Sequence, residues 1–564
     1  MASTPPEAPP EAPPEVRPET RPGPRAEACA VFGIALIAYL VIARWAIVDH
    51  NLVMGDAISR LGNATYALDS RYAHLSAIGF VWGPIPTLTM LPTMAVGLVP
   101  HTSWFVPSVS SCVFMAASVA VVNGIGRGWG LTRAWRLATT LFFATNPMIV
   151  FYAVNGMSEA YFILFLLLAA NRLSAWIVDD RSGDLALAGL WLGFGYLVRY
   201  EALAAAGAAA GMVALVGGWH TWMEHADERD LRERGKHVSG RVGLDVAVLV
   251  MPVVTAVAAF ALVSWIVTGQ AFAQFSSTYG NSSVIQATAP AATGLSALRF
   301  SIGELAGAGP LALPLVCLAA LWLDKERRSR ALGLVGVFGG VLALTALLQV
   351  TGKTLPFLRF WIAAIPLEVL LLGLLAAQWA QRPRRAHRLQ SLRAVAAVGG
   401  LVALVAATFS ITWSAMTNTI YGVQEHQIAT VVEPWRDRFD ERQTLAQFTA
   451  ERRLAAYLDA LRLPAGSVLV DVLDGFPVVA ASRDPRQFVI PSDFDFAQAL
   501  SDPVHYGVRY LLTVPDAGRG ANDALNMAFP GVYDNGLPGS RLLLQVDSGD
   551  LFPDWRLYRL ASSR

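Results

Sequence analysis

Charged and imidazole side chains gather in one part of the sequence, residues 49–104, and their types suit proton transfer. Asp56 follows a glycine, and Asp69, Arg71 and His74 come shortly after it. A carboxylate such as Asp56 takes a proton from an attacking hydroxyl group when it lies within hydrogen-bond reach. A Gly-Asp pair is also a common helix start, so a catalytic base and a helix cap both remain open for Asp56. Asp69 with Arg71 is more simply explained as an ion pair within the loop.

Three later places in the sequence also carry charged side chains between apolar runs. Glu159 follows an Asn-Gly-Met-Ser turn and suits the start of a helix. Arg199 and Glu201 lie two residues apart, where they would neutralise each other. Lys353 and Arg359 flank a short loop. Cations held at such a place favour an anionic partner such as a phosphate, with anchoring in lipid headgroups as the alternative.

Glu368 differs from these residues because it falls near the middle of the apolar segment IAAIPLEVLLLGLL. A carboxylate within a membrane-spanning segment costs several kcal/mol and normally faces the interior of a helix bundle. The sequence leaves two roles open for it, a structural hydrogen-bonding partner or a member of an ion path.

The elements that hold these residues are membrane-spanning helices. The chain has 564 residues, of which 54% are hydrophobic and 15% are charged, whereas a soluble domain carries about 25% charged residues. Long apolar segments such as 30–48 and 401–413 recur between short charged loops. This pattern predicts a polytopic α-helical membrane protein. The net charge of +1 gives no polycationic surface for nucleic acid, and the cysteines form no CxxC or Cys/His cluster that would bind zinc.

Arginine accumulates in three short loops, residues 127–136, 324–330 and 381–393, which the positive-inside rule places in the cytoplasm. With roughly 20 apolar residues per span, we expect about eleven spans. They are residues 28–48, 105–125, 134–152, 160–178, 184–198, 202–220, 244–267, 308–323, 331–350, 356–377 and 394–413. An odd number puts the N-terminus in the cytoplasm and the C-terminal region outside a plasma (inner) membrane. Lys353 and Arg359 then lie at the outer end of a span, against the charge rule.

Residues 81–99 are apolar but contain three prolines. Counting them as a span would place the basic loop 127–136 outside, so we expect a re-entrant or interfacial element. Irregular backbone at membrane depth is tolerated only where protein or a water-filled cavity covers it. A cavity on the outer face is therefore expected.

Composition divides the chain into three regions. Residues 1–26 contain nine prolines and predict a disordered cytoplasmic tail. Residues 27–413 form the transmembrane domain, and residues 414–564 have the composition of a globular extracytoplasmic α/β domain. In that domain, 433–462 has helical spacing. Strands are expected at 467–473, 487–490, 509–514, 542–546 and 555–560. No GxGxxG or Walker loop indicates a nucleotide site there.

Taken together, the motifs resemble the GT-C class of integral-membrane glycosyltransferases, which includes protein O-mannosyltransferases and aminoarabinose transferases. The matching features follow in order along residues 28–377. They are Asp56 after the first span, the Trp82-Gly-Pro84-Ile-Pro86 segment, Pro147 with Gly156-Met-Ser158-Glu159, a glycine-rich span ending at Arg199, and the element Arg359–Pro366.

The resemblance implies a polyprenyl-phosphate-linked sugar as donor and a glycan, lipid or protein hydroxyl as acceptor, with reaction on the outer face. It implies that Asp56 is the general base. It also implies that Arg359, with Lys353 or Arg199, holds the donor phosphate. Asp56 stands in a G-D-A setting, not the D-E or E-x-D setting often seen in the class, and Glu159 is the remaining acid in the next outer loop. The need for a divalent metal therefore stays open.

The main alternative function is a transporter or flippase for a lipid or small molecule. Transporters tend to have internal repeats and discontinuous helices at matching positions in two halves. The sequence shows no such repeat, and Glu368 is the feature that favours this class. A scaffold that merely displays residues 414–564 would not need polar outer loops between so many spans.

Overall fold

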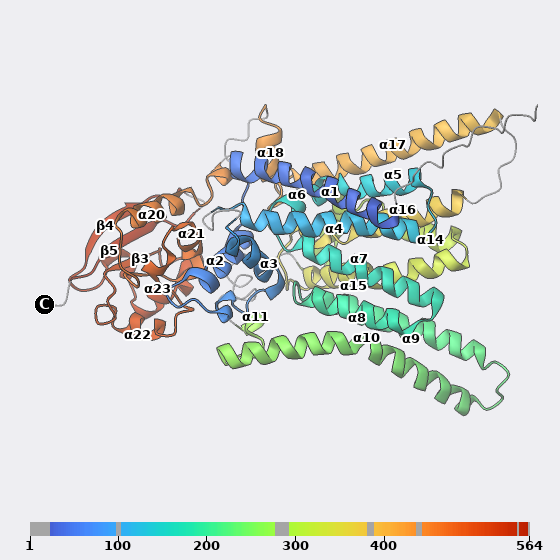
Figure 1. Cartoon of the computed structure of the whole chain (residues 1–564), viewed down its shortest axis with the longest axis horizontal. Coiled ribbons are helices and arrows are strands. Elements are labelled where there is room, and N and C mark those ends of the chain that lie inside the picture. Colours follow the sequence, from blue (N-terminus) through green and yellow to red (C-terminus); the bar gives the residue numbers. More distant parts are fainter. Residues whose placement is uncertain are drawn as a thin grey trace, which may run out of the picture.

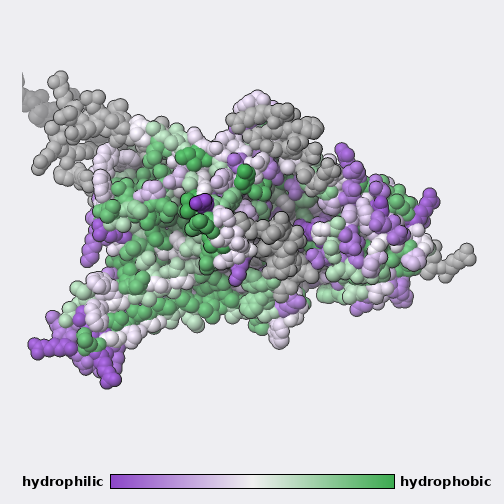
Figure 2. All heavy atoms as spheres, turned by 180° about the vertical axis from the view of Figure 1, so that it is seen from behind, coloured by the Kyte–Doolittle hydropathy of each residue, from purple (hydrophilic) through white to green (hydrophobic). Residues whose placement is uncertain are grey.

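The chain folds into a bundle of long apolar helices with a small α/β domain at one end (Figure 1). This computed structural model describes residues 23–97, 103–276, 293–380, 388–435, 443–549 and 552–561. Hydrophobic residues cover the middle of the bundle in Figure 2, and hydrophilic residues gather at its two ends. The predicted fold class, a polytopic helical membrane protein with a C-terminal α/β domain, is confirmed.

Seven helices of the described residues are long and apolar enough to cross a membrane. They are α1 (Pro24–Ala43) with the π-helical turn η1 (Arg44–Asp49), α4 (Val106–Gly128), α7 (Glu159–Asp179), α9 (Ala202–Glu224), α10 (Leu231–Thr268), α15 (Lys325–Val350), and the 3₁₀ turn η3 (Leu358–Trp361) with α16 (Ala364–Ala380). Two bent pairs raise the number to nine. These are α5 (Arg133–Ala144) with α6 (Pro147–Val154), bent by 61°, and α13 (Gly294–Ala308) with α14 (Ala312–Trp322), bent by 77°.

Two of the expected eleven spans fall outside this count. Residues 184–198 form α8 (Ser182–Tyr196), whose 15 residues fall short of the roughly 20 that a span needs. The last expected span lies within α17 (Arg388–Met416), of which Ala403–Met416 counts as a shorter apolar helix. Close packing against a neighbouring helix explains why α8 has a glycine at position 189. A Cβ at Gly189 would lie 2.0 Å from the carbonyl oxygen of Leu249, so α8 packs directly on the backbone of α10.

The start of the first helix lies at the basic end of the bundle. Glu27, in the first turn of α1, accepts a hydrogen bond from Arg136 at 2.6 Å and also pairs with Arg127. The α/β domain lies at the opposite end (Figure 1). The relative placement agrees with the predicted sidedness, and the orientation in the membrane stays a prediction. Residues 1–22 of the predicted disordered tail lie outside the described residues, and α1 begins at Pro24, where proline suits a first helical position.

The proline-containing segment forms α3 (Pro84–Ala95), a helix of 12 residues. At this length it is too short to span a bilayer, as expected for a re-entrant or interfacial element. It packs against α4 and against α2 (Gly55–Asp69), the helix that carries Asp56. A short 3₁₀ turn, η2 (Leu75–Ile78), lies between α2 and α3 in the sequence.

The α/β domain is built on a five-stranded sheet of order β2-β1-β3-β5-β4. The strands are β1 (Val468–Leu469), β2 (Phe488–Val489), β3 (Tyr510–Thr513), β4 (Arg541–Val546) and β5 (Trp555–Arg559). β1 is parallel to β2 and β3, and β5 is antiparallel to β3 and β4. All five expected strands are present.

Some elements of this domain are shorter than expected because local caps and turns end them early. The first strand was expected to reach residue 473, but Asp471 accepts a hydrogen bond from the Leu473 amide at 2.9 Å and starts α21 (Val472–Ala481). The expected helix 433–462 is interrupted at Phe448, whose φ is 60°, and residues 436–442 lie outside the description. Its described parts are η4 (Gln443–Ala446) and α20 (Thr449–Ala460). The other short elements are α11 (Ala273–Ser276), α18 (Gln427–Val432), η5 (Pro485–Gln487), α22 (Phe496–Ser501), η6 (Gly518–Asn522), α23 (Ala524–Ala528) and α24 (Val532–Asn535).

The α2 helix joins the two parts of the molecule. Tyr66, in its second half, is buried in the same apolar cluster as Leu454 and Trp555 of the α/β domain. Asp69, its last residue, accepts a hydrogen bond from Arg486 at 2.9 Å. One end of α2 is therefore fixed by the domain, while the other end carries Asp56.

Candidate active site

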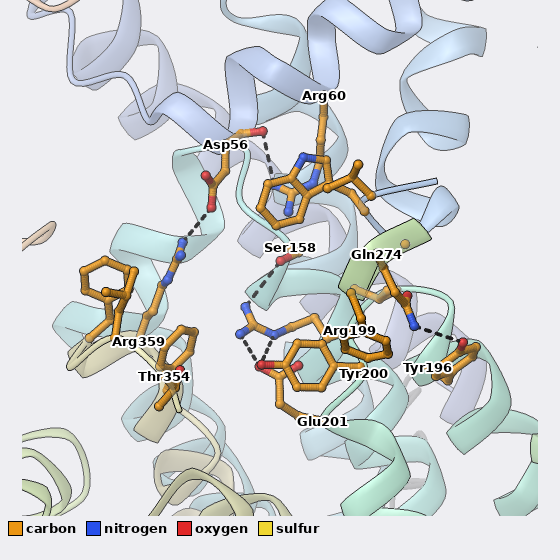
Figure 3. A pocket seen from close by; sticks show the side chains of 18 residues that line it. Asp56, Arg60, Ser158, Tyr196, Arg199, Tyr200, Glu201, Gln274, Thr354 and Arg359 are labelled. Atoms are coloured by element: carbon orange, nitrogen blue, oxygen red, sulfur yellow. Dashed lines mark hydrogen bonds and ion pairs between the residues drawn. The ribbon is translucent and has the colours of Figure 1, made fainter. Parts of the chain in front are cut away.

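A cavity of about 100 Å³ lies where α2, the turn between α8 and α9, α11 and the loop before η3 meet (Figure 3). Five charged residues are among those that line it: Asp56, Arg60, Arg199, Glu201 and Arg359. Aromatic rings and uncharged polar side chains form much of the remaining wall. Four of the residues that the sequence singled out, Asp56, Arg199, Glu201 and Arg359, thus converge on one strongly charged cavity.

Asp56 pairs with Arg359 across 303 residues of sequence. The Nη1 of Arg359 donates to Oδ2 of Asp56 at 3.0 Å. Asp56 lies in the first turn of α2, whose N-cap residue is Met54, so the structure gives the carboxylate an ion-pair partner instead of a capping role. Burial raises the pKa of Asp56, but the attraction of Arg359 and Arg60 outweighs it and holds this pKa below its ordinary value. The carboxylate is therefore charged at neutral pH.

Arg199 is held by two carboxylates. Its guanidinium donates to Glu159 and to Glu201, each at 2.5 Å, and to the hydroxyl of Ser158 at 3.4 Å. Arg199 and Glu201 thus neutralise each other, as their spacing in the sequence predicted. The Glu159 side chain is 1% exposed, and its Oε1 lies 3.9 Å from Nε of Arg359. Glu159 therefore connects the Arg199 cluster to the Asp56–Arg359 pair.

Arg60 is a functional candidate to which the sequence reasoning gave no role. It is 3% exposed, its guanidinium lies 5.1 Å from the centre of the Trp82 ring, and its Nη1 donates to the Asp56 carbonyl at 3.3 Å. Among the described residues, no carboxylate lies within ion-pair distance of it. Burial lowers the pKa of Arg60. Its spacing was the available signal, because residues four apart share one face of a helix.

Three other residues that the sequence singled out, Lys353, Asp69 and Arg71, do not line the cavity. Lys353 is exposed and is not among the residues that line the cavity. Asp69 and Arg71 do not pair with each other as expected. Asp69 pairs with Arg486, and Arg71 pairs with Asp493 at 3.2 Å and with Asp495, so both fix the α/β domain.

His74 lies at the same interface, stacked on the Phe494 ring with 4.7 Å between ring centres. Glu368 is fully buried and accepts a hydrogen bond from the Leu311 amide at 3.1 Å. This contact lies at the bend between α13 and α14, which corresponds to the structural alternative for Glu368.

A buried glutamate that the sequence reasoning missed supports the position of Arg359. Oε2 of Glu304, in α13, accepts hydrogen bonds from Gln349 at 2.6 Å and from the indole of Trp361 at 3.0 Å. Trp361 belongs to η3, the same turn as Arg359. A lone carboxylate in an apolar helix was the sequence signal for such a contact.

The described residues contain no evident metal-binding site. No group of three or more His, Cys, Asp and Glu side chains there is arranged to hold an ion. The metal requirement stays as open as the sequence leaves it.

No protein-family profile matches the sequence, and a search of curated protein sequences finds no match. A solved structure with a similar fold is that of ArnT from Cupriavidus metallidurans bound to undecaprenyl phosphate. The TM-score is 0.51 at 13% sequence identity, and the match covers 95% of this chain and 98% of that chain. The likeness therefore extends over the whole architecture, bundle and α/β domain together.

Proposed function

We propose that this chain, a membrane protein with the fold of ArnT, is a glycosyltransferase of the GT-C type. It would transfer a sugar from a polyprenyl-phosphate donor to an acceptor hydroxyl on the outer face of the plasma membrane. Three observations support this proposal. They are the order of the sequence motifs, the full-length likeness to a protein solved with a polyprenyl phosphate, and a cavity in which two carboxylates and three arginines converge.

The observation that carries the proposal is Arg60, a buried guanidinium with no carboxylate within ion-pair distance among the described residues. Asp56 and Glu159 attract it only from a greater distance. A buried charge without a close partner is costly, so this residue favours an anionic ligand. A phosphate group matches it, because guanidinium N–H groups bind phosphate oxygens in pairs. Arg359 lines the same cavity and is held by one charge partner, Asp56, at hydrogen-bond distance. Arg199 is less suited to this role since two carboxylates already occupy it.

The ion pair suggests how the donor would activate the base. When the donor phosphate binds Arg60 and Arg359, it competes with Asp56 for Arg359. The released carboxylate then accepts the proton of the acceptor hydroxyl. The hydroxyl oxygen forms a bond to the anomeric carbon, and the bond from that carbon to the phosphate oxygen breaks. The polyprenyl phosphate leaves with the electron pair, and the two guanidinium groups stabilise its charge.

A transporter or flippase is the alternative, and the two bent helix pairs favour it, because transporters often have discontinuous helices in both halves. In such proteins the helix breaks surround the substrate. Here the breaks at residues 145–146 and 309–311 contribute no lining residue to the described cavity. Sugar transfer therefore agrees better with the geometry.

The test is donor binding by purified protein in lipid nanodiscs, with a polyprenyl-phosphate-linked hexose as probe. Arg60→Gln should weaken binding about ten- to a hundredfold, since a hydrogen bond to a charged group contributes roughly 1.5–3 kcal/mol. Arg330→Gln is the matched control, because Arg330 pairs with Glu326 at 3.0 Å in the first turns of α15. Equal effects of both substitutions, or lipid flipping without sugar transfer in proteoliposomes, would contradict the proposal.

A further inference from the structure

The wall of the cavity away from the Asp56–Arg359 pair is uncharged. Tyr196 and Gln274 lie on that side in Figure 3, and the Gln274 amide donates to the Tyr196 hydroxyl at 3.4 Å. Tyr196 is the last residue of α8, is 4% exposed, and is fixed in place by the bundle. A hydroxyl and a primary amide both donate and accept hydrogen bonds, as the hydroxyl groups of a sugar do.

In the unliganded protein, neither carboxylate that lines the described cavity is free for a cationic ligand. The two carboxylates that line the described cavity are Asp56 and Glu201, and each is bound by a guanidinium group. An ammonium group entering this space would meet arginines and would have to displace one of them from its carboxylate. Such like-charge contacts in a partly desolvated site are strongly unfavourable.

Aromatic rings also line this cavity. They include Trp82, Phe275 and Phe360, and the rings of Trp82 and Phe360 lie beside the guanidinium groups of Arg60 and Arg359. Apolar rings with a few well-placed polar groups are the usual lining of a small-molecule site. They suit the C–H faces of a sugar ring, with the hydroxyl groups directed at the polar side chains.

The two sides belong to one cavity, so one ligand contacts both. A phosphate held by Arg60 and Arg359 would be joined to its sugar through a single oxygen atom. The ring would then fill the space next to the phosphate, on the side of Tyr196 and Gln274 (Figure 3). The donor sugar is therefore the group that we expect this wall to contact.

On the basis of the proposed function, we propose that the donor carries a neutral sugar, with hydroxyl groups and no amino or carboxyl group, and that Tyr196 and Gln274 recognise its hydroxyls. Tyr196 and Gln274 are thus specificity-determining residues. The discrimination against a charged sugar comes from the absence of any charged group on the recognising wall in the described cavity, where an amino or carboxyl group would lose its hydration without gaining a charged partner. The carboxylate that the donor phosphate releases, Asp56, lies on the opposite side of the cavity from Tyr196 and Gln274 (Figure 3).

The experiment compares three donors that share one polyprenyl phosphate and differ in the sugar: a hexose, an amino sugar and a uronic acid. Transfer is measured as released polyprenyl phosphate, with kcat and KM for each donor. The hexose should be used best. Tyr196→Phe and Gln274→Leu should each raise the KM for the hexose about two- to tenfold, the effect of one neutral hydrogen bond, with a smaller change in kcat.

A gain-of-function variant gives a sharper test of this assignment. Gln274→Glu places an unpaired carboxylate on the recognising wall, so it should reduce use of the hexose and increase use of the amino sugar. Tyr39→Phe is the control. Tyr39 is as buried as Tyr196, and its hydroxyl donates to the Ala144 carbonyl at 2.8 Å, away from the cavity. It should leave the preference unchanged, and melting temperatures show that all variants are folded.

The outcomes separate the two proposals. Transfer from none of the three donors refutes the proposed function itself. Transfer with a preference of the unaltered protein for the amino sugar or the uronic acid refutes the neutral-sugar inference and leaves glycosyl transfer standing. A preference for the hexose that neither Gln274→Glu nor Tyr196→Phe changes refutes the assignment of these two residues.

Discussion

Replacing Asp56 with asparagine should move turnover and donor binding in opposite directions. Asparagine keeps the size and one acceptor oxygen of the side chain but removes the base and its charge. Turnover should fall about 10²- to 10⁴-fold, which is the usual contribution of a positioned general base. A helix cap would predict otherwise, because asparagine caps a helix as well as aspartate does.

Donor binding should strengthen in the same variant. In the unliganded protein Asp56 occupies Arg359 at 3.0 Å, and the phosphate must displace it. A hydrogen bond to a charged group contributes roughly 1.5–3 kcal/mol, and the Asp56 side chain is 28% exposed, so solvent screening reduces this value. We expect the donor to bind about three- to tenfold more tightly once the competing carboxylate is neutral.

The assay pairs two measurements on one preparation in nanodiscs. Single-turnover release of polyprenyl phosphate gives the chemical step, and equilibrium binding of the labelled donor gives the affinity. Asp69→Asn is the matched control, because it alters the same helix at its other end. There the solvent-exposed pair with Arg486 adds little to the buried contact of Tyr66 that fixes this end of the helix. That variant should keep both quantities within about twofold, as surface substitutions usually do.

Two results would refute the reasoning about Asp56. Full turnover in Asp56→Asn would show that another group takes the proton, with Glu159 as the next candidate. Loss of donor binding together with turnover would show that the carboxylate holds the site together and does not compete with the phosphate.

Three further predictions concern stability and topology. Burial raises the pKa of Asp523 to about 7, so between about pH 4 and pH 7 the folded α/β domain keeps a proton that the unfolded chain releases. The free energy of unfolding should therefore fall by roughly 1.4 kcal/mol per pH unit over this range. Asp523→Asn should remove this slope in melting curves recorded at different pH values. Gly189→Ala should destabilise the bundle by about 1–3 kcal/mol, whereas Gly183→Ala, with nothing within 4 Å of the new Cβ, should not; equal melting temperatures would contradict the packing of α8 on α10. In a cysteine-free background, Leu75→Cys should react with an impermeant reagent in intact cells and Glu228→Cys should not; the reverse pattern would invert the orientation.

Several site residues were predictable because each occupies a marked place in a local pattern. Asp56 and Arg359 lie just past the ends of apolar segments, and both line the cavity. The apolar runs also predicted most helices, since span length follows from bilayer thickness. The 15-residue α8 departs from this rule because glycines let it pack on its neighbours, so it need not match the bilayer by itself.

The pairing of side chains was not predictable from the sequence. Asp69 and Arg71 are close in sequence, yet their partners lie more than 400 residues further on. Arg60 was given no role because an arginine near an aspartate is ordinary on an exposed helix. Its importance comes from burial without a carboxylate, and burial depends on the whole fold.

The docking of α2 has a consequence for the biosynthesis of the protein. Asp69 is made 417 residues before its partner Arg486, and translation proceeds at about 5–20 residues per second. For roughly 20 to 80 seconds, the helix that bears Asp56 is inserted at the membrane without the domain that fixes its far end. A chain released early would carry every arginine of the cavity and still lack a held base. Under the proposed function, catalytic competence would be the last property that the nascent chain acquires, and incomplete products would not consume the lipid-linked donor.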